Sequence, residues 1–217
     1  GPLQKAVEEL RALGVKAVGV AADITQPESA RRIHQQVVEA LGPVDILVNN
    51  VGRGRGAEEL FDTTDEDFRV TMEENLYASL RLIRLVLPGM IQRKWGRIIN
   101  IASIWGREYG GRVSYMPAKA SLIALSKHLA IRLAKHGVLV NSVAPGSILF
   151  PGGGWESWIN SHTKEEVEEF IKNNLPLGRF GWPEPVGDLV AFLASERAGL
   201  ITGACINIDG GQSRSLI

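Results

Sequence analysis

Apolar runs alternate with amphipathic segments along the whole chain, and this alternation constrains the fold more than any other feature. Runs rich in Val, Ile and Ala, which predict strands, occupy residues 16–25, 45–52, 96–103, 138–145 and 203–209. Segments with apolar side chains at helical spacing occupy residues 3–13, 26–42, 65–94, 114–137, 164–173 and 185–195. Strands that are apolar on both faces are typical of a parallel sheet with helices on each side. The sequence therefore predicts an α/β fold with a doubly wound parallel sheet.

The composition indicates an ordinary globular protein, and we expect residues 1–217 to form a single domain. The 24 Lys and Arg residues balance the 24 Asp and Glu residues, so no net charge attracts nucleic acid or an anionic membrane. No apolar segment of the sequence is long enough for a membrane span. A single cysteine and four histidines without ligand spacing predict neither a disulfide framework nor a metal site. We expect a cytoplasmic protein with no nucleic-acid partner and no membrane partner.

A ladder of glycines follows the predicted strand 45–52. Gly52, Gly54 and Gly56 stand in the run Leu-Val-Asn-Asn-Val-Gly-Arg-Gly-Arg-Gly, where a phosphate-binding turn could lie. A Gly-x-Gly spacing is weak evidence for phosphate binding without a following acidic residue in a βαβ unit. We therefore interpret Gly54 and Gly56 as residues that give the loop flexibility, and not as phosphate contacts.

Tyr115 and Lys119 are four residues apart in a predicted helix, so both side chains lie on one helix face. Such pairs are common on ordinary helix surfaces, but Ser103 ends the apolar run 96–103, and the carboxyl ends of parallel strands line the ligand crevice. A phenol titrates near ~10, and a nearby ammonium stabilises the phenolate and lowers that pKa. A serine hydroxyl could hold a carbonyl or alcohol oxygen beside the phenol. The three residue types suit proton transfer to or from a substrate oxygen.

Six motifs resemble those of the short-chain dehydrogenases/reductases, and the resemblance extends from about residue 3 to the C-terminus. The motifs are Asn-Asn-Val-Gly at 49–52, Asn75, Ser103, Tyr-Met-Pro-Ala-Lys at 115–119, Asn-Ser-Val-Ala-Pro-Gly at 141–146, and the run 201–211. The family usually has Ala where this chain has Val51. The resemblance implies a Rossmann-like fold and hydride transfer between NAD or NADP and a small-molecule carbonyl or alcohol. It extends to reductases of 3-oxoacyl thioesters and equally to sugar and small-alcohol dehydrogenases.

The resemblance also implies roles for individual residues near the reacting atoms. Tyr115 looks like the general acid/base, and Lys119 would lower its pKa and bind the nicotinamide ribose. Ser103 would orient the substrate oxygen. Asn75 would hold a helix kink and a water that passes protons toward Lys119. Asn49 looks like a residue that hydrogen-bonds from one strand to the next.

A cofactor site is implied in the same way. Its members are Asp23, Ile24, Asn50, Gly52, Tyr115, Lys119, Pro145, Gly146 and Ile148. The first two match family positions that contact adenine, and the next two would border the cofactor ribose. The last three would approach the nicotinamide carboxamide. The choice between NAD and NADP stays open.

The family pattern Thr-Gly-x-x-x-Gly-x-Gly, which forms the phosphate loop, has no counterpart in this sequence. We therefore expect an N-terminally incomplete sheet, with a chain that starts within the helix before the family's third strand and lacks both neighbours of that strand. The alternative to an oxidoreductase is then a non-catalytic truncated Rossmann-like module that no longer binds cofactor. The family is commonly tetrameric, which implies a homo-oligomer.

Residues 147–163 contain three consecutive glycines and two tryptophans, and they predict a long surface loop that acts as a substrate lid. Trp155 and Trp158 are candidates either for packing anchors or for substrate contacts. Arg107 and Arg112 lie between Ser103 and Tyr115 and could meet an anionic substrate, although surface positions are more common for arginine. The sequence does not identify the substrate.

Overall fold

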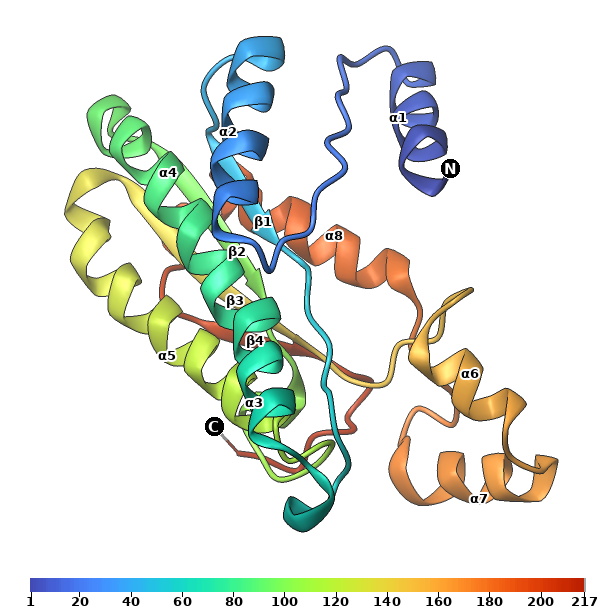
Figure 1. Ribbon diagram of the computed structural model, residues 1–217. Coiled ribbons are helices and arrows are strands. Elements are labelled where there is room, and N and C mark those ends of the chain that lie inside the picture. Colours follow the sequence, from blue (N-terminus) through green and yellow to red (C-terminus); the bar gives the residue numbers. More distant parts are fainter. Residues whose placement is uncertain (217) are drawn as a thin grey trace.

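The computed structural model describes residues 1–216, and this part of the chain contains a parallel sheet of four strands in the order β1-β2-β3-β4 (Figure 1). The strands are β1 (Ile46–Asn49), β2 (Gly96–Ile101), β3 (Val138–Pro145) and β4 (Cys205–Ile208). The register aligns Val48 with Ile99 and Ile98 with Val140. All four strands therefore end at the same edge of the sheet, and the predicted α/β fold is confirmed.

Helices cover both faces of this sheet. The described residues form the helices α1 (Pro2–Ala12), α2 (Pro27–Leu41), α3 (Asp65–Met72), α4 (Ala78–Arg93), α5 (Tyr115–Leu133), α6 (Gly154–Asn160), α7 (Lys164–Asn174) and α8 (Pro183–Ala194). Of these, α4 and α5 pack on one face and α8 packs on the other. On one face, Met90 of α4 packs in a cluster with Ile98 and Val140. On the other face, Leu193 of α8 packs in a cluster with Ile99. Burying each such side chain contributes about 1.5–3 kcal/mol, so the two clusters fix the sheet between its helical layers.

The predicted long helix 65–94 is present, with an irregular turn in its middle. It begins at α3 with a capping box between Thr64 and Asp67, in which each side chain accepts from the other residue's backbone N–H. Residues Glu73–Tyr77 then form a π-helical turn that joins α3 to α4. Such turns occur frequently at functional sites. The turn contains Asn75, which is fully buried, and the helix kink and the water expected at this residue stay predictions.

The prediction of a strand at residues 16–25 is wrong. The segment forms an extended connection between α1 and α2, with a turn at residues 24–25. Side chains hold it: Arg11 donates to the carbonyl of Ala17, and Arg32 donates to the carbonyl of Ala21. A strand needs a ladder partner. Among the described residues, no strand lies beside this segment. An apolar pattern alone does not make a strand where no neighbouring strand is present to hydrogen-bond with it.

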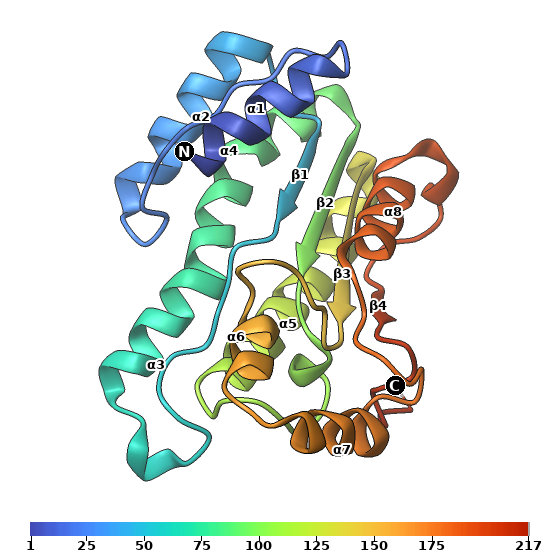
Figure 2. The same cartoon turned by 90° about the vertical axis from the view of Figure 1, so that its right-hand side faces the viewer.

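Residues 147–163 do not form the uninterrupted loop that the sequence predicts. The glycine run leads into α6, with Gly153 as the N-cap and Gly154 as the first helical residue, and α7 follows with a capping box between Thr163 and Glu166. Figure 2 shows α6 and α7 at the end of the sheet to which the strand arrows point. The segment is therefore partly helical and lies at the edge of the sheet where a site is expected.

Candidate active site

A cavity of about 680 Å³ lies at the carboxyl ends of the strands. Eight of the residues predicted for catalysis or cofactor binding line it: Asn50, Gly52, Ser103, Tyr115, Lys119, Pro145, Gly146 and Ile148. They come from the ends of β1, β2 and β3 and from the first turns of α5. The parallel sheet therefore brings together residues that are far apart in the sequence.

Lys119 is held next to Tyr115 by the geometry of α5. The helix begins at Tyr115, so Lys119 lies one turn further along the same face. Its Nζ donates to the carbonyl of Ile101 over 2.8 Å and lies 5.4 Å from the centroid of the Tyr115 ring. Lys119 is only 2% exposed. Its ammonium is therefore a desolvated donor with a fixed position beside the phenol.

The pKa of Tyr115 differs in direction from the sequence prediction. Burial raises the pKa of Tyr115 to about 12, and a hydrogen bond with Ser103 acts weakly in the opposite direction. Burial also lowers the pKa of Lys119 to about 8. The prediction that Lys119 lowers the phenol pKa is wrong for this structure, because desolvation penalises the phenolate more than its neighbours stabilise it. At neutral pH, Tyr115 is a protonated phenol that can donate.

Gly52 allows a close approach that no other residue would permit. A Cβ at this position would lie 2.2 Å from Oδ1 of Asn75 and 2.9 Å from Nζ of Lys119. Asn75 donates through Nδ2 to the carbonyls of Thr71 and Arg53. Its Oδ1 is buried, and no donor of the described residues contacts it. An unpaired acceptor therefore lies behind the cavity wall, close to the Lys119 ammonium.

The loop after β1 is fastened to α3 and to the start of α5. The backbone N–H of Arg55 donates to Oγ1 of Thr71, and the Ser114 hydroxyl donates to the carbonyl of Arg55 over 2.8 Å. The hydroxyls of Thr71 and Ser114 lie 3.1 Å apart. Nη2 of Arg55 pairs with the buried Glu74 carboxylate over 2.5 Å. These bonds fix the residue that precedes Tyr115.

The two later glycines of this loop serve packing. A Cβ at Gly54 would lie 3.0 Å from the Cβ of Tyr115, and Gly56 has a φ of 69°. Gly54 therefore lets the loop lie against α5, and the flexibility expected from Gly54 and Gly56 stays a prediction. Asn49 has the predicted role: its Nδ2 donates to Oδ1 of Asn100 on β2 over 2.7 Å.

Asp23 and Ile24 are not brought to this cavity. They lie at the turn before α2, and the Asp23 carboxylate accepts from the backbone N–H and the hydroxyl of Thr25. These bonds hold the pKa of Asp23 below its usual value. The predicted adenine contacts therefore lie outside the region where the reacting residues meet.

The arginines that were candidates for anion binding do not line the cavity. Nη1 of Arg107 donates to the carbonyl of Cys205 and to Oδ1 of Asn207, and Nη1 of Arg112 donates to the carbonyl of Gly56. Arg107 therefore fastens the turn after β2 to β4, and Arg112 fastens the segment before α5 to the loop after β1.

Besides Tyr115, three aromatic residues line the cavity: Trp105, Phe150 and Trp155. Trp155 was a candidate from the sequence, whereas Trp105 and Phe150 were not predicted. Trp105 stands two residues after Ser103, where the Ser103 hydroxyl accepts from its backbone N–H. The position just beyond the strand end was the signal that could have identified it.

Within residues 1–216, no group of His, Cys, Asp and Glu side chains has the arrangement of a metal site. In the same part of the chain, no helix combines the length and apolar character that a membrane crossing needs.

A family model described as Enoyl-(Acyl carrier protein) reductase matches residues 1–213. The chain belongs to the short-chain dehydrogenase/reductase family, and it is an oxidoreductase that uses NAD or NADP. It is 39% identical to 3-oxoacyl-(acyl-carrier-protein) reductase FabG of Aquifex aeolicus (strain VF5). The aligned region has 216 residues and covers 98% of this chain and 84% of that protein.

Other curated relatives are similar over comparable lengths. The reductase FabG of Vibrio cholerae is 37% identical over 201 residues, which covers 92% of this chain and 79% of that protein. The (2S)-((R)-hydroxy(phenyl)methyl)succinyl-CoA dehydrogenase subunit BbsD of Thauera aromatica is 34% identical over 207 residues, which covers 95% of this chain and 80% of that protein. These comparisons support the oxidoreductase and give no support to a non-catalytic module.

Proposed function

We propose that the chain interconverts a carbonyl and an alcohol, with Tyr115 as the general acid/base. The observation that carries this proposal is the meeting of Tyr115, Ser103 and Lys119 at one wall of the cavity. In the reducing direction the Tyr115 phenol donates its proton to the substrate oxygen, and the raised pKa keeps that proton available at neutral pH. The Ser103 hydroxyl, which is hydrogen-bonded to the Tyr115 phenol, orients the substrate oxygen.

The residues at the cavity fit the nicotinamide ribose. A lysine ammonium has three donor hydrogens, and only the Ile101 carbonyl accepts from Lys119 among the described residues. The ribose hydroxyls would accept from this ammonium, with Asn50 and Gly52 beside them. When bound, the nicotinamide supplies or accepts the hydride. Pro145, Gly146 and Ile148 also line the cavity and would face the carboxamide.

Oxidation and reduction should respond differently to pH. Alcohol oxidation needs the Tyr115 oxygen as a base, so its rate should rise as the pH approaches the raised pKa of about 12. Carbonyl reduction needs the protonated phenol and should show no such rise. The names of the relatives extend the proposed substrates to 3-oxoacyl and acyl-CoA compounds.

Removing one hydroxyl tests the assignment. Tyr115→Phe should lower the turnover number about 100-fold or more, because general acid/base catalysis typically contributes on that scale. The measurement is the change in nicotinamide absorbance with NADH and with NADPH, in both reaction directions. Tyr109→Phe is the matched control, because Tyr109 is 95% exposed and does not line the cavity. Turnover near that of the parent protein in a folded Tyr115→Phe variant would refute the role.

We also propose a cytoplasmic homo-oligomer. Ile131 on α5 is 72% exposed and Tyr77 beside α4 is 43% exposed, so both helices present apolar surface to solvent. The balanced charge gives no support for a nucleic-acid partner. Light scattering coupled to size-exclusion chromatography should give a multiple of the 23.6 kDa chain mass. A monomer at micromolar concentration would refute the oligomer.

A further inference from the structure

The substrate side of the cavity has an aromatic wall. Trp105 follows β2, and Trp155 belongs to α6; their ring centroids lie 6.4 Å apart with an interplanar angle of 46°. Both residues line the cavity that contains Ser103 and Tyr115. Two indoles from segments far apart in the sequence therefore face the region where the reacting oxygen is expected.

Trp105 is held by glycine backbone. A Cβ at Gly110 would lie 2.3 Å from its Nε1, and a Cβ at Gly111 would lie 2.7 Å from its Cε3. Any larger residue at either position would push the indole away. Arg107 fastens the same turn to the carbonyl of Cys205 on β4. The orientation of this indole is therefore set before a substrate arrives.

Trp155 is supported by three further aromatic rings. Its ring centroid lies 5.0 Å from Phe170, 5.2 Å from Phe180 and 5.7 Å from Trp158. Aromatic pairs at such separations contribute beyond their buried area. Trp158 itself does not line the cavity, so it supports Trp155 from behind and is not a direct contact.

The cavity wall offers little to a charged group. Among the described residues that line it, Lys119 is the only one with a charged side chain, and its ammonium is assigned to the Ile101 carbonyl and the ribose hydroxyls of the cofactor. Val186 and Val190 continue the apolar lining. A carboxylate next to the reacting carbonyl would lose its hydration without a partner.

We propose that Trp105 and Trp155 determine specificity and select a substrate that carries a flat, neutral aryl group next to the reacting carbonyl. The inference rests on the proposed carbonyl/alcohol activity and deepens it by naming the substrate class. Offset or edge-to-face contacts with two fixed indoles favour a phenyl ring over an alkyl group of similar size, by about 0.5–1.5 kcal/mol for each contact.

A matched pair of substrates tests the proposal. Ethyl benzoylacetate and ethyl 3-cyclohexyl-3-oxopropanoate share the ester and the ketone and differ in a phenyl or a cyclohexyl group, which have the same number of carbons. We expect kcat/KM to be higher for the benzoyl compound, by about 5-fold to 100-fold for two such aromatic contacts. Trp105→Leu and Trp155→Leu should each reduce this ratio by about 2-fold to 10-fold. Trp155→Phe, which keeps an aromatic ring, should retain most of the ratio that the parent protein shows.

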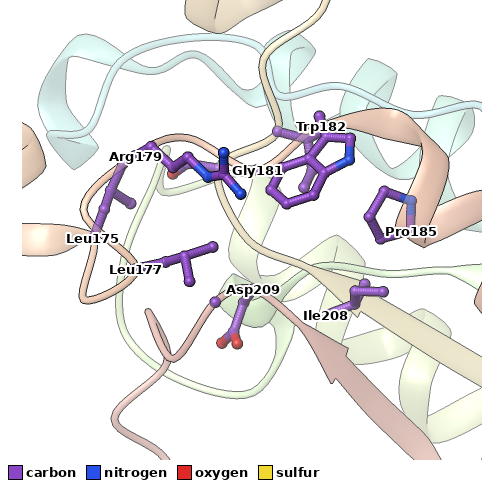
Figure 3. A pocket seen from close by; sticks show the side chains of 11 residues that line it. Leu175, Leu177, Arg179, Gly181, Trp182, Pro185, Ile208 and Asp209 are labelled. Atoms are coloured by element: carbon purple, nitrogen blue, oxygen red, sulfur yellow. The ribbon is translucent and has the colours of Figure 1, made fainter.

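A nearby tryptophan provides the control. Trp182 lines a separate pocket of about 140 Å³ and stacks on the Arg179 guanidinium, whose Cζ lies 4.4 Å from the ring centroid (Figure 3). Trp182→Leu should leave the substrate ratio unchanged.

The outcomes separate the inference from the proposed function. Equal kcat/KM for the two ketones, or a ratio that both leucine variants leave intact, would overturn the aryl selectivity while the oxidoreductase stands. Failure of the parent protein to reduce either ketone, or any ketone of a wider panel, would count against the proposed carbonyl chemistry itself. The ratio in the parent protein decides the inference even if a leucine variant fails to fold.

Discussion

At the scale of single residues, Lys119 should give the stability of the protein a distinctive pH dependence. The folded chain releases the Lys119 proton near pH 8, whereas the unfolded chain keeps it to about pH 10.5. Between these values the unfolded state binds more protons, so the free energy of unfolding should rise with pH, by at most about 1.4 kcal/mol per pH unit.

Urea unfolding at a series of pH values measures this effect. Lys119→Met should lack the rise, whereas Lys127→Met, at an exposed position of the same helix, should keep it. Identical pH profiles for the parent protein and Lys119→Met would show that the ammonium is not desolvated.

Gly52 provides a second test at this scale. In Gly52→Ala the new Cβ would meet Oδ1 of Asn75 and Nζ of Lys119, so one of these side chains must move. We expect a loss of stability of about 1–3 kcal/mol, as for other overpacked sites, together with reduced turnover. Gly187→Ala is the control, because its Cβ would enter open space although Gly187 also lines the cavity. Parent-like stability and turnover in Gly52→Ala would contradict the close packing.

The site residues that could be predicted from the sequence are those whose chemical type and spacing indicate proton transfer. Ser103, Tyr115 and Lys119 could be found because a strand end and a helical turn place them reliably. The direction of the Tyr115 pKa could not be predicted, because desolvation depends on what surrounds the phenol and not on the residue four positions away. Trp105 was missed because attention went to side chains that transfer protons, although its position just after a strand end placed it at the edge of the sheet where the cavity lies.

At the scale of elements, the π-helical turn Glu73–Tyr77 connects the loop after β1 to the catalytic helix. Glu74 is 8% exposed and accepts from Nη2 of Arg55. Glu74→Gln keeps the shape and removes the charge, so it should lower the melting temperature and reduce turnover through the Arg55–Ser114 contact. Glu66→Gln, which alters an exposed pair with Arg69, should change both much less. Equal effects of the two substitutions in melting and activity assays would argue against this role.

The segment 147–163 is expected to act as a lid. Its glycines precede a short helix, α6, whose Trp155 lines the cavity. Amide hydrogen exchange should be fast in this segment without ligand and slower with cofactor and ketone present. Exchange as slow as that of β2 and β3 in the free protein would argue against a lid.

Most elements follow from periodicity, because apolar patterning reports which faces are buried. Four of the five predicted strands are present, and the exception at residues 16–25 shows the limit of the method. A run of Val and Ala indicates a preference for extended, buried backbone. It carries no information on whether a neighbouring strand lies within hydrogen-bonding reach. The helix within 147–163 was hidden for a related reason: Gly153 acts there as an N-cap, which composition does not distinguish from a loop glycine.

At the scale of the whole molecule, the parallel sheet brings the residues of the site together. β2 and β3 are fixed by apolar clusters on both faces, and their carboxyl ends deliver Ser103 and Pro145 to one cavity. A buried chain of hydrogen bonds also links β1 to α5 through β2, and it runs from Asn49 to Asn100 and on to Ser126. The central claim is that this assembled site transfers a hydride between a nicotinamide cofactor and a carbonyl carbon.

Isotope transfer tests that claim most directly. The protein is supplied with a ketone and with NADH or NADPH that carries deuterium at the transferable position, and the product alcohol is analysed by mass spectrometry and NMR. We predict one deuterium on the carbinol carbon, in a single configuration, and slower formation of the same product by Tyr115→Phe. A folded protein that yields no deuterated alcohol from any ketone of a broad panel, or an alcohol whose carbinol hydrogen comes from water, would contradict it.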